Sequence, residues 1–348
     1  MNTSLSRSQR LSAFTPLWLK RLLIKVLPQT WLIRLRGEEK SHVRIPWAVS
    51  REDPAALSLR RLEGKRPHLQ RVIVHLCDHC NLNCRSCTHF SNICKPTFTD
   101  LASFTRDFER MAALFSQINE IYLLGGEPLL HPEVASFLRV ARTCFPHADI
   151  ELMTNGILLP RMKEEFWEAM AQNDILLDTD LYPIGPGKER ITELAVAHQV
   201  RYEFKEYRDE VFFRLPLDPS GSQDPVQAFV ACEHADITCP TLRDGLLYPC
   251  AYVAYCDAFK ERFDLDGFEV SPADYRDIYQ VTSGWELFDL LCAPIPWCRF
   301  CDFAHKEPIS WEQASPKKAR ATDWLVTTPE VERQDRPGDL PAASESSR

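Results

Sequence analysis

The sequence predicts an α/β fold built on a parallel β-sheet. Between residues 71 and 215, short apolar runs typical of buried strands alternate with longer segments of helical periodicity. Strands separated by helices favour a parallel sheet with right-handed crossovers. Polar and cysteine-containing motifs follow several of these strands, so chemically active side chains are expected at one edge of the sheet.

The expected elements follow one another in a regular order. The apolar run 72–76 is the first strand, and it leads directly into a group of cysteines. A helix over 101–115 and a strand over 121–124 come next, and this strand ends at a pair of glycines. The alternation then continues with a helix at 134–145, a strand at 149–153, a helix at 164–171, a strand at 175–177, a helix at 191–198 and a strand at 201–204.

Cys80, Cys84 and Cys87 form a C-x3-C-x2-C group just after the first strand. Cysteine thiolates are the usual ligands of iron–sulfur clusters, and three of them leave one iron of a [4Fe–4S] cluster open to a non-protein ligand. A zinc site is the alternative, in which Cys77 or His79 supplies the fourth ligand.

This spacing, together with Gly125–Pro128 and Thr154–Gly156 further along the chain, resembles the radical S-adenosylmethionine (radical SAM) superfamily. The resemblance implies a partial (β/α)6 barrel of the TIM type. It also implies that the open iron binds the amino and carboxylate groups of SAM, and that one electron from the cluster cleaves SAM to a 5′-deoxyadenosyl radical. The SAM contacts that it implies are Gly125, Gly126, Glu127, Pro128, Thr154 and Asn155, with Asp180 as a candidate contact to the ribose or the substrate.

Three of these positions carry a more specific expectation. Gly125 and Gly126 lack Cβ atoms, which would let the backbone come close to a bound ligand. Glu127 takes the acidic position that contacts the SAM ammonium in the family. Ser86 stands where the family usually has an aromatic residue, so Phe90 is expected to pack on the adenine instead.

A second group of cysteines lies between residues 225 and 305. The pattern Cys232-x12-Gly245-x4-Cys250 is similar to the SPASM/twitch extensions of radical SAM enzymes, which implies one auxiliary [4Fe–4S] cluster. Spacing favours Cys232, Cys250, Cys298 and Cys301 as its ligands, but Cys239 could replace Cys232 or one of the last pair. The cysteine left without iron is a candidate donor of a hydrogen atom to a substrate radical.

These motifs divide the 348 residues into four parts. Residues 1–68 are a basic amphipathic extension, 69–224 the barrel, 225–305 the auxiliary-cluster domain, and 306–348 a Pro/Ser-rich tail expected to be largely disordered. The extension would lie on an anionic membrane surface, dock on an acidic partner or pack on the catalytic domain as an accessory helix.

Composition excludes several classes of protein. An odd count of 13 cysteines in short-spaced groups argues against a disulfide framework and for metal ligation in the reducing cytoplasm. The chain has no run of about 18 apolar residues that would span a membrane. The basic extension lacks an aromatic stacking platform, which argues against nucleic acid as a partner.

The sequence therefore predicts a radical SAM oxidoreductase or epimerase. Its substrate would be a small polar molecule, carbohydrate-like or an aminocyclitol, and a reductant such as flavodoxin or ferredoxin would supply the electron. A maturase that modifies a peptide is the alternative enzyme, and a non-catalytic iron–sulfur or zinc protein is the alternative from another class.

Overall fold

The computed structural model describes residues 45–46, 48–206, 213–232, 240–314 and 316–326. The predictions for residues 1–44 and for Cys239 lie outside these ranges. Among the residues that the structure describes, none of the helices combines the length and the apolar character that crossing a bilayer requires.

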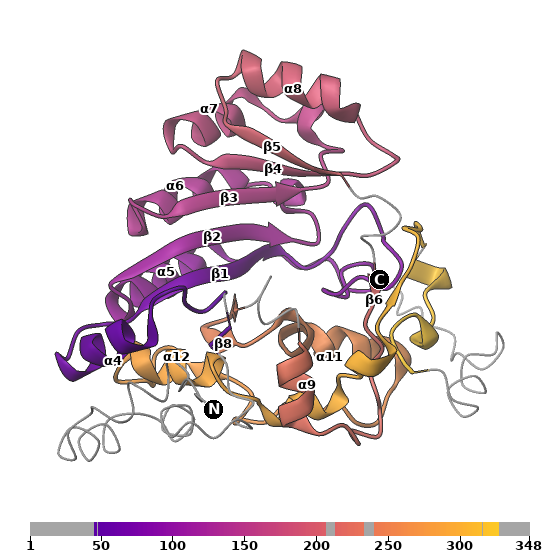
Figure 1. Ribbon diagram of the computed structural model, residues 1–348. Helices are drawn as coiled ribbons and strands as arrows, with labels where there is room; N and C mark the ends of the chain where they lie inside the picture. The colour runs from indigo at the N-terminus through magenta and orange to yellow at the C-terminus, as the bar shows by residue number, and fades with distance from the viewer. Residues whose placement is uncertain (1–44, 47, 207–212, 233–239, 315, 327–348) are drawn as a thin grey trace, which may run out of the picture.

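The structure confirms the predicted α/β partial barrel. Eight strands form one sheet in the order β5-β4-β3-β2-β1-β7-β8-β9, in which β1 to β5 run parallel (Figure 1). The strands are β1 (His68–Cys77), β2 (Gln117–Gly125), β3 (Asp149–Thr154), β4 (Leu176–Leu181), β5 (Tyr202–Glu206), β6 (Phe213–Arg214), β7 (Thr241–Arg243), β8 (Leu246–Tyr248), β9 (Arg276–Asp277) and β10 (Glu307–Pro308).

The helices between the parallel strands cover one face of the sheet, as Figure 1 shows for α5, α6 and α7. In α5, Phe104, Phe108 and Met111 recur at helical spacing and belong to the core beneath the sheet. Asp100 caps this helix by accepting a hydrogen bond from the Ser103 amide. The helices are α4 (Pro54–Leu62), α5 (Leu101–Leu114), α6 (Val134–Cys144), α7 (Glu164–Gln172), α8 (Gly187–Ala197), α9 (Pro225–Ala231), α11 (Ala251–Phe263) and α12 (Gly284–Leu291).

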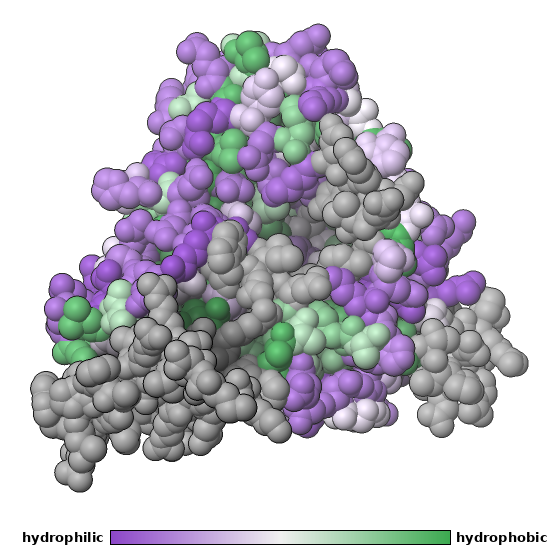
Figure 2. All heavy atoms as spheres, viewed as in Figure 1, coloured by the Kyte–Doolittle hydropathy of each residue, from purple (hydrophilic) through white to green (hydrophobic). Residues whose placement is uncertain are grey.

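The sheet continues beyond β1 into the C-terminal region. β7 pairs in parallel with β1, and β7 and β8 form an antiparallel hairpin. A second hydrophobic core surrounds α11 and includes Phe259, Trp297 and Trp324. Figure 2 shows hydrophilic residues over the upper part of the molecule, near α7 and α8, and a hydrophobic group near α9 and α11. The C-terminal region is thus joined to the barrel by strand pairing, yet has a core of its own.

Residues 306–314 and 316–326 differ from the predicted disordered tail. β10 pairs antiparallel with β6, and the Leu217 amide donates a 2.6 Å hydrogen bond to the carbonyl oxygen of Trp324. Trp324 and Leu325 are buried in the second core. The polar composition of this segment predicted disorder. Burial of a few large apolar side chains is nevertheless enough to order residues 306–314 and 316–326.

Asp218 stabilises the loop that lies beside Cys301. Its carboxylate accepts hydrogen bonds from the backbone amides and hydroxyls of Ser220 and Ser222 and from the Gln223 side chain. Its own amide donates to the Phe300 carbonyl oxygen at 2.8 Å. Burial alone would raise the pKa of Asp218, but the donated hydrogen bonds outweigh it and lower the pKa to about 2.

We expect Asp218→Ala to lower the free energy of unfolding by on the order of 2 kcal/mol, because several donors lose their charged acceptor. Because the folded pKa lies below the ordinary value of 3.8, this contribution is complete above pH 4 and is lost as pH falls towards 2. Urea unfolding of both proteins at pH 7 and at pH 3 measures it. An equal gap between the two proteins at both pH values would contradict the assignment.

Candidate active site

The loop after β1 carries Cys80, Cys84 and Cys87, and amide groups point at their sulfur atoms. The Leu82 amide donates to Cys80 Sγ at 3.3 Å, and Asn155 Nδ2 donates to the same atom at 3.7 Å. The backbone amides of His89, Phe90 and Ser91 donate to the sulfur of Cys87. Donors directed at sulfur stabilise the negative charge that a thiolate or a sulfide-rich cluster carries.

The sulfur of Cys84 receives its hydrogen bonds from residues outside this loop. Trp311 Nε1 donates to Cys84 Sγ at 3.0 Å, and the Tyr182 side chain is a second donor to this sulfur. Ala314 reaches the same loop, where its amide donates to the Asn83 carbonyl oxygen at 2.7 Å. Sequence reasoning missed Trp311 because it placed this residue in the disordered tail.

The number of cysteines in this group fits a cluster with one open iron. Three thiolates leave one iron of a [4Fe–4S] cluster free for another ligand, whereas a structural zinc site takes four protein ligands. Burial raises the pKa of the Cys84 thiol to about 12, and the charge of Cys87 adds to this rise.

The glycine pair has a different neighbour from the expected ligand. A Cβ atom on Gly125 would lie 2.2 Å from the carbonyl oxygen of Cys77, and one on Gly126 would lie 2.1 Å from that of His79. The Gly126 and Glu127 amides donate to these same two carbonyl oxygens. The glycines therefore let the end of β2 pack on the start of the cysteine loop, and this fixes the loop on the sheet.

Glu127 joins the Gly125–Pro128 motif to the Thr154–Gly156 motif. It is 0% exposed. Its Oε1 accepts hydrogen bonds from the Leu129 amide and from Thr154 Oγ1, and its Oε2 accepts one from the Asn155 amide. Burial outweighs these hydrogen bonds and raises the pKa of Glu127 to about 7. The carboxylate thus ties the ends of β2 and β3 together beneath the loop, while Pro128 begins the 3-10 turn Pro128–Leu130.

The other predicted contacts divide into two groups. Asn155 lies at the cysteine loop, where its Nδ2 also donates to Asn81 Oδ1 at 2.8 Å. Asp180 lies close enough to Cys84 to raise the pKa of that thiol further. Phe90, in contrast, is 0% exposed and stacks on Phe259 at a ring distance of 5.1 Å. The expectation that Phe90 packs on an adenine is therefore wrong, because this side chain belongs to the second core.

Four cysteines of the second group line one cavity. Cys232, Cys250, Cys298 and Cys301 surround it, and the rest of the wall is largely apolar. Its other lining residues include Phe229, Leu291, Ile295, Trp297 and Phe303. Four thiols in an apolar cavity match the ligand number of a complete [4Fe–4S] cluster. Sequence spacing favoured the same four residues.

Tyr252 lies between the two cysteine groups, and sequence reasoning missed it. Burial raises the pKa of its hydroxyl, and the charges of Cys301, Cys87 and Cys250 add to this effect. Its ring packs edge-on against Phe90 at 5.6 Å. Phe90, Tyr252, Cys250 and Cys301 belong to the same second core. No sequence signal marks this tyrosine, because the contact depends on how α11 packs on the loop.

A family comparison agrees with this geometry. Residues 74–181, from β1 to the end of β4, match the model of the radical SAM superfamily. The chain contains a radical SAM domain. Radical SAM domains use SAM and a [4Fe–4S] cluster, and the donor set of Cys80, Cys84 and Cys87 fits the three thiolates that such a cluster needs.

Curated relatives match mainly over the radical SAM domain. The GTP 3′,8-cyclase of Peptoclostridium acidaminophilum is 30% identical over 49% of this chain and 53% of its own length. That of Heliobacterium modesticaldum is 33% identical over 32% of this chain and 34% of its own. The chain spans about a third of the length of the first relatives that it matches.

Solved structures give looser likenesses. BtrN in complex with AdoMet and 2-DOIA has a TM-score of 0.39 and 14% identity, covering 67% of this chain and 92% of its own. SuiB of Streptococcus suis, bound to the precursor peptide SuiA, has a TM-score of 0.31 and 11% identity, covering 55% and 53%.

The hydrogen bond from Trp311 to Cys84 gives a prediction about the cluster of the radical SAM domain. A donor to a ligating sulfur favours the more negative, reduced cluster. We therefore expect Trp311→Phe to lower the midpoint reduction potential, measured by electron paramagnetic resonance (EPR) in a redox titration. Trp285→Phe is the control, because the Trp285 indole donates instead to the Lys65 carbonyl oxygen. Equal potentials in the wild type and Trp311→Phe would contradict the role of this contact.

Proposed function

We propose that this chain is a radical SAM enzyme that acts on a small polar substrate. When bound, SAM supplies a 5′-deoxyadenosyl radical by reductive cleavage, and this radical abstracts a hydrogen atom from the substrate. The observation that carries the proposal is the set of amide and indole donors directed at Cys80, Cys84 and Cys87 where β1 ends.

The residues at the ends of β2, β3 and β4 are proposed to bind SAM. Because the three hydrogen bonds to Glu127 come from the protein itself, Glu127 acts mainly by holding Thr154 and Asn155 beside the loop. The backbone of Gly125–Pro128 and the side chains of Asn155 and Asp180 then face the cofactor. These groups orient SAM, and the surrounding core excludes water from the site.

Cys232, Cys250, Cys298 and Cys301 are proposed to hold an auxiliary [4Fe–4S] cluster. The cavity that they line supports this ligand set. Such a cluster would accept an electron from the substrate radical and give a two-electron oxidation. Return of a hydrogen atom by a free thiol, for which Cys239 is the candidate, would give epimerisation instead. A flavodoxin or ferredoxin is the proposed electron donor.

The polarity of the sheet's inner face favours a polar substrate. Tyr122, Glu151, Asp178 and Lys205 lie on strands whose alternate residues pack into the helix-covered core. The alternative is a maturase that acts on a peptide. A panel of amino sugars, aminocyclitols, nucleotides including GTP, and short peptides tests this choice, because only a true substrate increases 5′-deoxyadenosine above the rate with SAM alone. Stimulation by peptides alone would favour the maturase.

Iron and sulfide analysis of anaerobically reconstituted protein tests the cluster assignment. Two cubane clusters predict about eight irons and about eight sulfides per chain. About four of each would remove the auxiliary cluster from the proposal. Zinc without sulfide would overturn both assignments.

A further inference from the structure

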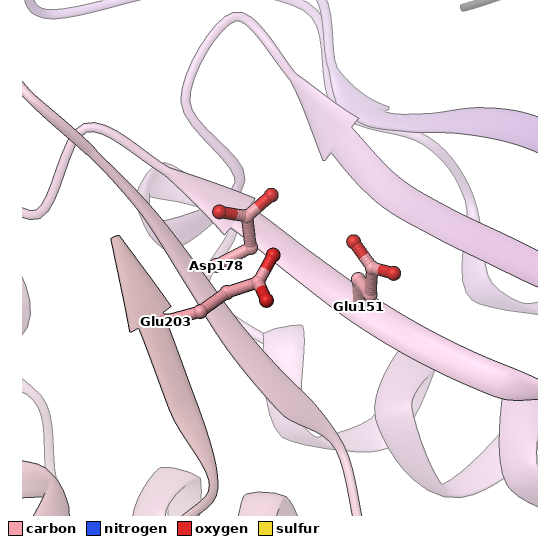
Figure 3. A group of neighbouring side chains, drawn as sticks. All are labelled: Glu151, Asp178 and Glu203. Carbon is pink, nitrogen blue, oxygen red and sulfur yellow. The ribbon is translucent and has the colours of Figure 1, made fainter. Parts of the chain in front are cut away.

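Three carboxylates converge on the inner face of the barrel and include none of the cysteines described above. Glu151, Asp178 and Glu203 come from the neighbouring strands β3, β4 and β5, and Figure 3 shows their carboxyl groups directed into one shared space. One oxygen of each lies within 4.8 Å of the others. Asp178 and Glu203 are register partners, and Asp178 is also the partner of Met153.

One of these carboxylates, that of Asp178, has a buried oxygen without the hydrogen bond that burial normally requires. Glu151 is 8% exposed and Asp178 is 1% exposed. Glu151 forms neither a hydrogen bond nor an ion pair in the described part of the chain. Asp178 binds Lys205 through Oδ2, but its Oδ1 is buried and accepts no hydrogen bond. An unpaired buried carboxylate is costly, so this arrangement indicates a missing positive partner.

Charge and ligand type indicate what that partner is. With all three carboxylates ionised, Lys205 supplies one positive charge against three negative charges, which leaves two negative charges in excess. A divalent cation cancels this excess. An oxygen-only ligand set suits hard cations such as Mg²⁺, Mn²⁺ and Ca²⁺, and opposite oxygens around Ca²⁺ lie about 5 Å apart. Burial raises the pKa of Glu151 to about 7, and the charges of Asp178 and Glu203 contribute to this rise.

The geometry points to a hard divalent-cation site formed by Glu151, Asp178 and Glu203 on the inner face of β3, β4 and β5. Asp178 lies two residues before Asp180 on β4, so the ion would occupy the layer of the barrel just below the strand ends that carry the proposed SAM contacts. The site does not depend on the identity of the substrate or on SAM cleavage.

Titration of the reconstituted full-length protein with Mn²⁺ tests the inference. After removal of free metal with EDTA and desalting, loss of the free Mn²⁺ EPR signal measures binding. We expect one saturable site per chain, from which Ca²⁺ displaces Mn²⁺. Glu151→Gln and Glu203→Gln should each weaken binding roughly tenfold or more, because each removes one charged ligand.

Two variants guard the test against a folding defect and against nonspecific effects of losing a charge. The Glu203 side chain is exposed, so Glu203→Gln should fold normally even if the change at the buried Glu151 does not. Glu168→Gln on α7 is the matched control and should bind Mn²⁺ as the wild type does. Absence of a saturable site in the wild type, or equal binding by the wild type and Glu203→Gln, would overturn the inference.

Discussion

Cys84→Ala is expected to abolish reductive cleavage of SAM. Cys84 lies in the middle of the C-x3-C-x2-C loop, and its sulfur receives the Trp311 indole and the Tyr182 side chain. With two thiolates left, the loop no longer holds a cluster with a single open iron. Formation of 5′-deoxyadenosine in the presence of dithionite should fall to the level of a sample without protein, and iron should fall to about four per chain.

Cys144→Ala is the control for this experiment. Cys144 lies at the end of α6 and belongs to neither cysteine group. The variant should keep the iron content and the SAM cleavage of the wild type. Measurable 5′-deoxyadenosine from Cys84→Ala above the protein-free level would show that another residue supplies the third ligand.

Cys250→Ala is expected to separate the two clusters. It removes one of the four thiols that line the apolar cavity but leaves the first loop intact. Iron should again fall to about four per chain, yet 5′-deoxyadenosine should still form, because SAM binds at the other cluster. Conversion of a true substrate should be lost.

The comparison between Cys84→Ala and Cys250→Ala tests whether the two cysteine groups have different roles. Both variants lose about half of the iron, but only the first loses SAM cleavage. Equal residual cleavage in the two variants would contradict the proposed division of roles. Normal iron content in Cys250→Ala would instead make Cys239 or another thiol the ligand.

Local sequence patterns were sufficient to predict the sheet, and they singled out both cysteine groups as candidate sites. Alternating apolar runs and amphipathic segments report burial directly, so β1 to β5 and their helices were predicted close to their observed positions. The C-x2-C spacing keeps Cys298 and Cys301 close together, and the fold brings Cys232 and Cys250 to the same cavity.

Contacts between segments far apart in the chain could not be predicted in this way. Phe90 was expected at a ligand, but packing against Phe259 in α11 buries it. Trp311 lies in a polar segment that composition marks as disordered, although its indole reaches Cys84 across more than two hundred residues. The glycine pair was expected at a ligand, but the atoms that leave no room for a Cβ there belong to Cys77 and His79.

The most direct test of the account measures 5′-deoxyadenosine in oxygen-free, reconstituted wild-type protein supplied with SAM and dithionite. If Cys80, Cys84 and Cys87 hold a cluster with one open iron, the product forms and requires the protein, SAM and the reductant. If no 5′-deoxyadenosine forms in a sample that contains its full complement of iron and sulfide, the proposed radical chemistry is wrong.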